Sequence, residues 1–236
     1  MMDVLEQFWQ AYLFENHGQM SGVAVTLWLL VLAVSMGFFL SLFMAVGRVS
    51  PRRSISWPLW AFSYVFRGTP LYVQILFIYA GLYSLDFVKG TPPLAAFFQS
   101  GFNCLVLALT LNTTAYTMEI FAGAIRATPA GEIEAARAFG MGRFAQYRRI
   151  ILPSALRRAL PAYSNEVILM LHATSLAFTA TVPDILKVAR DANSATYQTF
   201  AAYGIAAVLY LILSFVLIGL FRRFERRTLA YLRHNH

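Results

Sequence analysis

Residues 132–161 read EIEAARAFGMGRFAQYRRIILPSALRRALP, a stretch that holds six arginines and two glutamates. The chain around it is very different, because 58% of its 236 residues are hydrophobic and only 13% are charged. Soluble domains average about 25% charged residues. The stretch is therefore a charged interruption in a chain with the composition of a membrane protein.

Apolar segments lie on both sides of this interruption. A helix needs about 20 residues to cross ~30 Å of hydrocarbon, and five segments reach that length. We therefore expect an all-α membrane protein whose five transmembrane helices form one domain, residues 1–236. The expected spans are residues 20–47, 57–83, 98–124, 162–182 and 199–221.

The basic residues set the expected orientation of these spans. Fifteen of the nineteen Lys and Arg residues lie within residues 48–53, 126–158 and 222–233. Lys and Arg gather in cytoplasmic loops, so these regions are expected in the cytoplasm and the N-terminus on the outer side. Because the net charge of +8 is clustered between apolar spans, it indicates a lipid bilayer and not a nucleic acid as the partner.

Inside the interruption the sequence predicts a short helix. The Thr128-Pro129 pair is typical of a helix start, with Thr128 as the N-cap and Pro129 in the first turn. Gly140 is a natural stop, which leaves about ten residues, too few to span a membrane. A second helix is expected to begin near Tyr147 and to end at Pro153 or Pro161. A solvated basic loop is the plainer alternative for this region.

The spacing of one set of residues favours a docking element over a loop. The pattern E-A-A-x3-G-x9-I-x-L-P is spread over twenty residues, and it resembles the signature of permease subunits of bacterial ABC importers. In that family the short helix is the coupling helix, which fits a cleft on a separate ATPase subunit. The resemblance implies that ATP and Mg bind to the partner, and that this chain is no enzyme and carries no cofactor. The residues that match the signature are Glu134, Ala135, Ala136, Gly140, Ile150, Leu152 and Pro153.

Further motifs are similar to the polar amino acid branch of these permeases. They are FRGTPLYVQ at 66–74, AYTMEIFAGAIR at 115–126 and NEVILMLHATSL at 165–176. The chain most resembles M-type subunits of histidine, lysine, arginine and ornithine importers, with opine permeases as the nearest rivals. The resemblance implies a type I ABC importer permease fold in the bacterial inner membrane. It also implies four kinds of partner: a Q-type permease subunit, an ABC ATPase homodimer, a periplasmic lysine/arginine/ornithine- or histidine-binding protein, and a basic amino acid as substrate.

Ionisable groups inside spans are costly, so each is a candidate for function. On the third span, Asn112, Tyr116, Glu119 and Gly123 share one helical face. The Glu119 carboxylate is suited to a cationic side chain or an α-ammonium group. The alternative is that Glu119 pairs with Arg67 or a backbone amide and only fixes helix packing.

The second and fourth spans hold the other candidates for the substrate pathway. Asn165, His172, Ser175 and Thr179 share a face of the fourth span, where many branch members resemble Lys-Asp and this chain has His-Ala. The alternative to a pathway role is that His172 only packs against a neighbouring helix. A metal site is not indicated, because no second metal ligand lies at helical spacing from His172. Arg67 precedes Gly68 and Pro70, so we expect a kink there, with Arg67 either paired to an acid or directed to the membrane surface.

Two other acidic residues and two other function classes complete the sequence-based expectations. Glu166 and Asp184 are expected to cap a helix or to face water.

A transporter or channel that works without a motor is an alternative function class, although the coupling signature argues against it. An intramembrane hydrolase built from Ser164, Ser175 and His172 is remote, because the chain lacks a G-x-S-x-G elbow and an H-E-x-x-H site.

Overall fold

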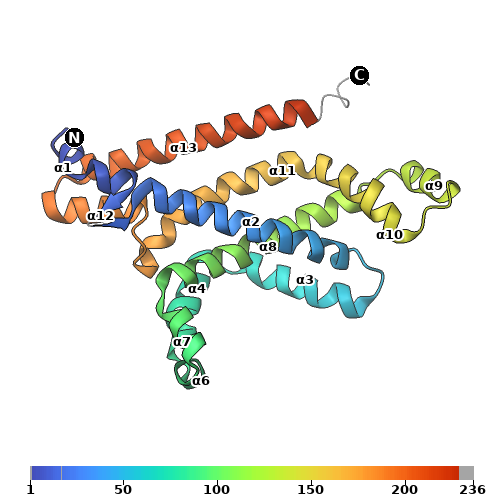
Figure 1. Cartoon of the computed structure of the whole chain (residues 1–236), viewed down its shortest axis with the longest axis horizontal. Coiled ribbons are helices and arrows are strands. Elements are labelled where there is room, and N and C mark those ends of the chain that lie inside the picture. The colour runs from blue at the N-terminus through green and yellow to red at the C-terminus, as the bar shows by residue number, and fades with distance from the viewer. Residues whose placement is uncertain (1, 17, 229–236) are drawn as a thin grey trace.

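The computed structural model describes residues 2–16 and 18–228, and these residues are almost entirely helical (Figure 1). Four long helices run side by side along the longest dimension of the molecule. They are α2 (Gly22–Arg48), α8 (Gly101–Arg126), α11 (Leu152–Ala173) and α13 (Thr199–Thr228).

Small residues allow α2 and α8 to pack closely at the centre of this bundle. Ala33, Gly37, Ser41 and Ala45 recur every four residues along α2, and all four are buried. A methyl group at Gly37 would collide with the Thr113 side chain on α8. Close approach through small residues is how membrane helices gain van der Waals contact without a hydrophobic driving force. The α2–α8 pair is therefore the spine against which the other helices pack.

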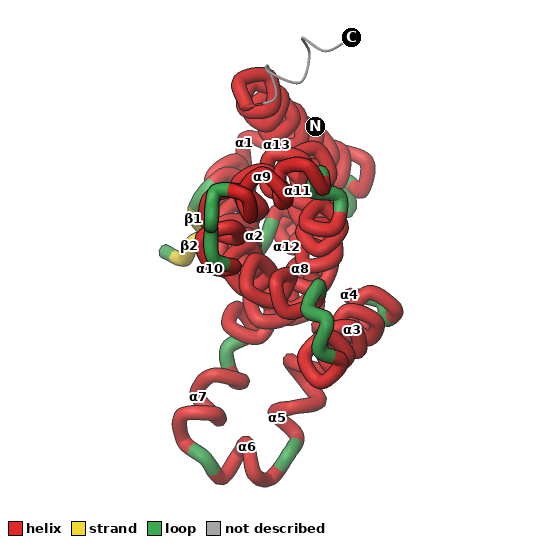
Figure 2. Tube along the Cα trace, turned by 90° about the vertical axis from the view of Figure 1, so that its right-hand side faces the viewer, coloured by secondary structure: helices red, strands yellow, loops and turns green. Residues whose placement is uncertain are grey.

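The second expected span is a broken helix. Helix α3 (Arg53–Gly68) is followed by α4 (Leu71–Leu76) and a π-helical turn, η1 (Phe77–Gly81), and the path bends by 105° at the break. The kink expected at Pro70 is thus confirmed. Three short helices follow and project away from the bundle (Figure 2): α5 (Leu82–Ser84), α6 (Asp86–Gly90) and α7 (Pro92–Gln99).

At the opposite end from the charged interruption, the N-terminal segment packs against the C-terminal helices. Helix α1 (Met2–Leu13) and a two-stranded antiparallel ribbon, β1 (Glu15–Asn16) and β2 (Gln19–Met20), precede α2. A short helix, α12 (Ile185–Thr196), follows Pro183 and Asp184. Asp184 is its N-cap, because its carboxylate accepts hydrogen bonds from the backbone N–H groups of Leu186 and Lys187.

Three described helices, α2, α8 and α13, are long and apolar enough to cross a membrane, and the bent path from Arg53 to Ser84 makes a fourth candidate. The expected fourth span differs most from its prediction. It begins earlier, as α11, and gives way at Thr174 to a 3-10 helix, η3 (Thr174–Ala180). Arg157, Arg158 and Glu166 lie within α11 and lower its apolar character.

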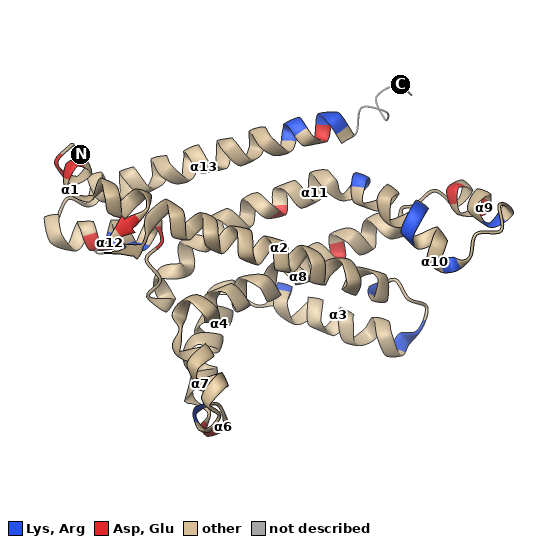
Figure 3. Ribbon diagram, viewed as in Figure 1, with Lys and Arg blue, Asp and Glu red and all other residues tan. Residues whose placement is uncertain are grey.

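Lys and Arg residues concentrate at one end of the bundle (Figure 3). This end holds α9 (Ala130–Ala138), α10 (Arg143–Gln146) and the beginning of α3. The basic C-terminal turns of α13 lie toward the same end, whereas α1 and α12 lie at the other. The uneven loop charges read from the sequence thus correspond to a polarity of the folded molecule.

Candidate functional site

The short helix of the charged interruption exists as α9, with a start that differs from the prediction. Thr128 is not the N-cap, because the helix begins at Ala130 with Pro129 in the capping position. The Thr128 hydroxyl accepts a hydrogen bond from Arg158, and no side chain in the described structure caps the first turn of α9. Glu132 still lies in that turn, where a carboxylate complements the positive end of the helix dipole.

The end of α9 confirms Gly140 as the stop and explains why it is glycine. Gly140 has a φ of +72°, the left-handed region in which other residues are strained. Its N–H donates to the Arg137 carbonyl at 2.8 Å, and the Met141 N–H donates to the Ala136 carbonyl at 3.0 Å. These two bonds form a Schellman motif, which satisfies carbonyl groups left open at a helix end.

The second helix of the interruption was predicted to end at Pro153 or Pro161, and this prediction is wrong. The helical path begins at Arg143 with α10, passes through the π-helical turn η2 (Tyr147–Ile151) and continues as α11. Pro153 lies in the first turn of α11, where a missing N–H costs little. Pro161 is accommodated within α11. The charged interruption is therefore directly continuous with a helix of the bundle.

The signature residues lie around a surface cavity of about 480 Å³ beside α9. Ala135, Ala136, Ile150 and Pro153 line this cavity, whereas Glu134 and Gly140 are exposed outside its lining. The remaining signature residue, Leu152, is partly buried. The structure thus brings the two halves of the signature, from α9 and from the start of α11, to one surface.

Two aromatic residues at this surface had no contact role assigned from the sequence. Phe139 is 86% exposed and Phe144 is 78% exposed, on either side of the turn after α9. Large apolar side chains exposed in a polar region are typical of a protein contact site. The available signal was two phenylalanines within an otherwise charged connection.

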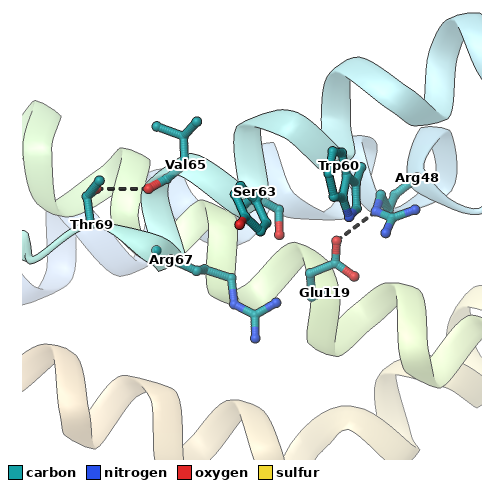
Figure 4. Close-up of a pocket in the computed structure, with 9 residues that line it drawn as sticks. Arg48, Trp60, Ser63, Val65, Arg67, Thr69 and Glu119 are labelled. Atoms are coloured by element: carbon teal, nitrogen blue, oxygen red, sulfur yellow. Dashed lines mark hydrogen bonds and ion pairs between the residues drawn. The ribbon is translucent and has the colours of Figure 1, made fainter.

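A second region of interest is a cavity of about 530 Å³ that contains Glu119, here called the Glu119 pocket (Figure 4). Helices α2, α3 and α8 supply its walls, close to the break between α3 and α4. Its lining residues are Arg48, Trp60, Ser63, Tyr64, Val65, Arg67, Gly68, Thr69 and Glu119.

Glu119 has a partner that the sequence did not indicate. Arg48 Nε donates to Glu119 Oε1 at 2.7 Å, and the two side chains are only 17% and 18% exposed. The prediction that Glu119 pairs with Arg67 or a backbone amide is therefore wrong in its partner. Because Arg48 and Arg67 both line the pocket with one carboxylate, its formal charge is positive even with Glu119 ionised.

Arg67 does not pair with an acid at ion-pair distance in the described part of the chain, contrary to one of its predicted roles. Its guanidinium group lies 5.2 Å from the centre of the Tyr116 ring instead, a cation–π arrangement. Figure 4 shows the Glu119 carboxylate directed toward Arg48 and the Arg67 guanidinium directed away from that pair. An anionic group beside Arg67 would meet a guanidinium group that forms no salt bridge among the described residues.

Asn112, also predicted to lie on the substrate pathway, forms hydrogen bonds at the bend between α3 and α4. Its side-chain amide donates to the Phe66 carbonyl at 3.3 Å and to Gln74 Oε1 at 3.2 Å. Gln74 Nε2 donates to the Phe66 and Thr69 carbonyls at 2.8 and 3.0 Å. These two amides replace the helical hydrogen bonds lost at Pro70, so the broken backbone is satisfied without water.

The candidates on the fourth span separate into different surroundings. His172 Nε2 lies 3.0 Å from the Ser214 hydroxyl on α13, a link between helices. Thr179 donates to the Leu176 carbonyl within η3, which also contains the partly buried Ser175. Asn165 is exposed. The structure therefore does not gather these residues with Glu119 in one cavity.

Glu166 is 7% exposed and lies beside the Thr113 hydroxyl, so the prediction that it caps a helix or faces water is wrong. Asp184 is fully buried, and its predicted role as a helix cap is confirmed by the hydrogen bonds that it accepts at the start of α12. Burial raises the pKa of Asp184 to about 6, although three backbone N–H groups and the Tyr210 hydroxyl oppose the shift. No group of three or more His, Cys, Asp or Glu side chains suited to a metal ion occurs among residues 2–16 and 18–228.

Comparison with known proteins places these features in a family. The family model described as binding-protein-dependent transport system inner membrane component matches residues 37–230. The chain belongs to this family. It is thus a permease subunit in the inner membrane, a membrane component of an ABC transporter and not its ATPase.

Individual relatives resemble the chain over nearly its whole length. It is 64% identical over 233 residues to the histidine/lysine/arginine/ornithine transport system permease protein HisM of Escherichia coli K12, covering 99% of this chain and 98% of that protein. The octopine transport system permease protein OccM of Rhizobium radiobacter is 42% identical, covering 92% of this chain and 86% of that protein. A crystal structure of an amino acid ABC transporter with histidines contains a chain with 35% identity and a TM-score of 0.75, covering 86% of this chain and 90% of that chain. The expected ABC importer permease fold is confirmed.

Proposed function

We propose that this chain forms one half of the membrane pathway of an ATP-driven importer of histidine, lysine, arginine and ornithine. The observation that supports this proposal most directly is the 64% identity to HisM over 99% of the chain. The lower identity to an octopine permease, 42%, makes opine import the second candidate for the same fold.

The proposed arrangement in the membrane has five crossings within one permease domain, residues 1–236. The crossings are α2, the bent path from α3 to α5, α8, α11 with η3, and α13. The N-terminus faces the periplasm and the C-terminus the cytoplasm, because the basic end of the bundle then lies on the cytoplasmic side. The concentration of Lys and Arg around α9 and α10 supports this orientation.

Residues 125–161 form the proposed coupling region, with α9 as the coupling helix. The surface around Glu134, Ala135 and Gly140 would dock on an ABC ATPase homodimer, which binds ATP and Mg. The exposed rings of Phe139 and Phe144 support such a contact, since they would otherwise expose apolar area to water. The cavity of about 480 Å³ beside α9 offers a concave surface, with both apolar and charged lining residues, into which a side chain of the ATPase could fit.

The Glu119 pocket is the proposed substrate contact within this subunit. An amino acid carries a carboxylate and an ammonium group on one carbon, and the pocket offers a charge of each sign. The substrate carboxylate would pair with Arg67, and the α-ammonium group with Glu119. Because Arg48 already pairs with Glu119 at 2.7 Å, a second cationic group from the substrate side chain gains little here. Selection of basic side chains would therefore rest mainly with the periplasmic binding protein or the Q-type permease subunit.

Transport in this proposal follows alternating access. Closure of the ATPase homodimer moves α9, and the helices attached to it tilt, so that the pathway opens toward the periplasmic binding protein. The substrate enters, meets the Glu119 pocket and leaves to the cytoplasm when the helices return. Chemical energy is released only in the partner subunits, and this chain performs no covalent step.

The decisive experiment is reconstitution in proteoliposomes with a Q-type permease subunit, the ATPase and the binding protein. We expect uptake of radiolabelled arginine or histidine that requires ATP hydrolysis, and little uptake of octopine. Uptake of octopine in preference to arginine would replace the substrate assignment with the second candidate. Uptake by this chain without the ATPase would contradict the motor-driven mechanism.

A further inference from the structure

Arg158, on α11, lies where three elements of the coupling region meet. Its Nη1 donates to the Ser154 hydroxyl on α11 at 2.6 Å. Its Nη2 donates to the Thr128 hydroxyl at 2.8 Å, in the connection between α8 and α9, and to the Ala124 carbonyl near the end of α8 at 3.3 Å. One guanidinium group therefore joins a bundle helix to both the preceding helix and the link that leads into α9.

A second contact extends this network into α9 itself. Ser154 donates to Glu132 Oε2 at 2.9 Å, and Glu132 lies in the first turn of α9. One series of hydrogen bonds thus connects Glu132, Ser154, Arg158 and Thr128. At one end of this series the acceptor is the Glu132 carboxylate, and at the other end the acceptors are the Thr128 hydroxyl and the Ala124 carbonyl. Charge-assisted bonds of this kind are stronger than neutral ones and fix geometry as well as distance.

The shape of arginine matters for this arrangement. The planar guanidinium directs donors along fixed, separate lines, and here Nη1 and Nη2 reach different elements. Arg158 Nε is buried and has no hydrogen-bond partner in the described structure, so the side chain is held by its two outer nitrogens. A lysine would bring one ammonium group on a flexible stem and could not span both sides in the same way.

The two ends of α9 are therefore attached differently. Its C-terminal end is followed by the Gly140 turn and α10, from which the helical path runs on through η2 into α11. Its N-terminal end follows α8 after only three residues, 127–129, and is bound to α11 through Arg158. The Arg158 contacts thus link α11 by hydrogen bonds to the end of α8 and to the connection between α8 and α9.

We propose that Arg158 is a positioning residue that makes α8 and α11 move together with the coupling helix. It transmits motion from the ATPase contact to the bundle and contacts neither ATP nor the substrate. This inference rests on the proposed function, because it needs α9 to be the element that the ATPase moves. It adds that the link from α9 to the membrane helices depends on one identifiable hydrogen-bonded network.

The test compares Arg158→Gln with Arg223→Gln in the reconstituted importer. Arg223 is an exposed arginine near the end of α13, outside the coupling region, and provides a control for loss of one positive charge. In Arg158→Gln we expect ATP hydrolysis at half or more of the unmodified rate, but about tenfold fewer arginine molecules imported per ATP. Tenfold corresponds to about 1.4 kcal/mol of coupling free energy. Arg223→Gln should keep the unmodified ratio, and Arg158→Lys should fall between the two.

A structural role alone would give a different result. If Arg158→Gln lowers assembly, hydrolysis and uptake in proportion, the number of molecules imported per ATP stays constant and the inference is overturned. Thr128→Val and Ser154→Ala keep the arginine and remove one acceptor each, so they test the network if Arg158→Gln does not assemble. We expect each to lower the import ratio, and their double variant to match Arg158→Gln. Unchanged ratios in these variants would also overturn the inference.

The same experiment separates this inference from the proposed function. If the unmodified complex fails to couple hydrolysis to uptake, the proposed function is wrong. If the unmodified complex couples normally and Arg158→Gln keeps its import ratio, only the role of Arg158 is wrong. A cysteine at Ala135, crosslinked to the ATPase, should react equally in both forms, since docking does not depend on Arg158.

Discussion

The ion pair between Arg48 and Glu119 allows packing and substrate binding to be separated. Glu119→Gln keeps the shape of the side chain but removes its charge. Arg48 would then remain at the end of α2, with its side chain only 17% exposed and a neutral group in place of its partner. Removing one member of a covered pair leaves the other charge uncompensated, whereas removing both does not.

The expected cost follows from the burial of the pair. Fully exposed pairs contribute about 0–1 kcal/mol, and loss of one partner of a fully buried pair costs about 3–5 kcal/mol. Here about four fifths of each side chain is covered, and the N–O distance is 2.7 Å. We therefore expect Glu119→Gln and Arg48→Gln each to destabilise the subunit by about 2 kcal/mol, within the range for hydrogen bonds to charged groups. The double variant should lose about 1 kcal/mol or less.

The assay has two readouts on the same four proteins in lipid nanodiscs or proteoliposomes. Unfolding measurements give stability, and the KM for arginine uptake reports substrate contact. If Glu119 binds the substrate, the double variant recovers stability while its KM stays raised by about tenfold, equal to about 1.4 kcal/mol. Recovery of both readouts would refute substrate contact and leave packing as the role of Glu119. Additive losses of stability would refute the importance of the ion pair itself.

Three other regions give further predictions. A Cβ at Gly140 would meet no atom within 4 Å, so the cost of Gly140→Ala comes from backbone strain at positive φ alone, and we expect a destabilisation of about 1–2 kcal/mol. Gly140→Asn should cost less, because asparagine tolerates this conformation better. Equal unfolding midpoints for the two variants would contradict this reasoning. Phe139→Ala and Phe144→Ala should each change the stability of the subunit by less than about 0.5 kcal/mol, since both rings are exposed. Each should nevertheless weaken binding of the ATPase about tenfold in a titration. An unchanged affinity would exclude the two rings as contacts. Burial raises the pKa of Asp184 from 3.8 to about 6, so the folded protein binds the proton more tightly than the unfolded chain. The contribution of Asp184 to stability should therefore fall as pH rises from about 4 to about 6, and the unfolding midpoint of Asp184→Asn should lack this part of the pH dependence.

Local features of the fold were predictable because they depend on neighbours in sequence. The apolar runs placed α2, α8 and α13 within a few residues, apart from the end of α13, because helix length and hydrocarbon thickness constrain each other. Gly140 and Asp184 were readable as a helix stop and a helix cap, since each acts on backbone groups within a few positions. The spacing Ala33, Gly37, Ser41 and Ala45 carried the same kind of information about α2, although it was not used.

Contacts across the bundle were not predictable from one sequence. The Arg48–Glu119 pair joins residues on different helices, and nothing in the local pattern favours Arg48 over Arg67. Asn112 was assigned to the pathway because it shares a face with Glu119, yet the bend at Pro70 creates carbonyl acceptors that its amide satisfies. Such roles arise only when distant segments meet, so periodicity alone cannot separate a structural polar residue from a functional one.

The two prolines of the interruption show where a local rule fails. Proline lacks the N–H that a regular helix needs, which favoured an end at Pro153 or Pro161. At Pro153 the π-helical turn η2 lies directly before it, and the Leu152 N–H donates to the Tyr147 carbonyl, one residue further back than in an α-helix. The altered bonding pattern of this turn carries the helix up to Pro153. Pro161 is exposed inside α11, where the bundle packs around the opposite face.

The continuity of α10, η2 and α11 has a mechanical consequence. Helix α11 has 22 residues, which gives it a length of about 33 Å at about 1.5 Å per residue. Pivoting such a rod by about 10° at the end next to η2 displaces its far end by about 6 Å, comparable to one helical pitch. A stroke of ångströms at an ATPase surface can therefore be enlarged by leverage alone, provided that the rod does not buckle at its π-helical turn.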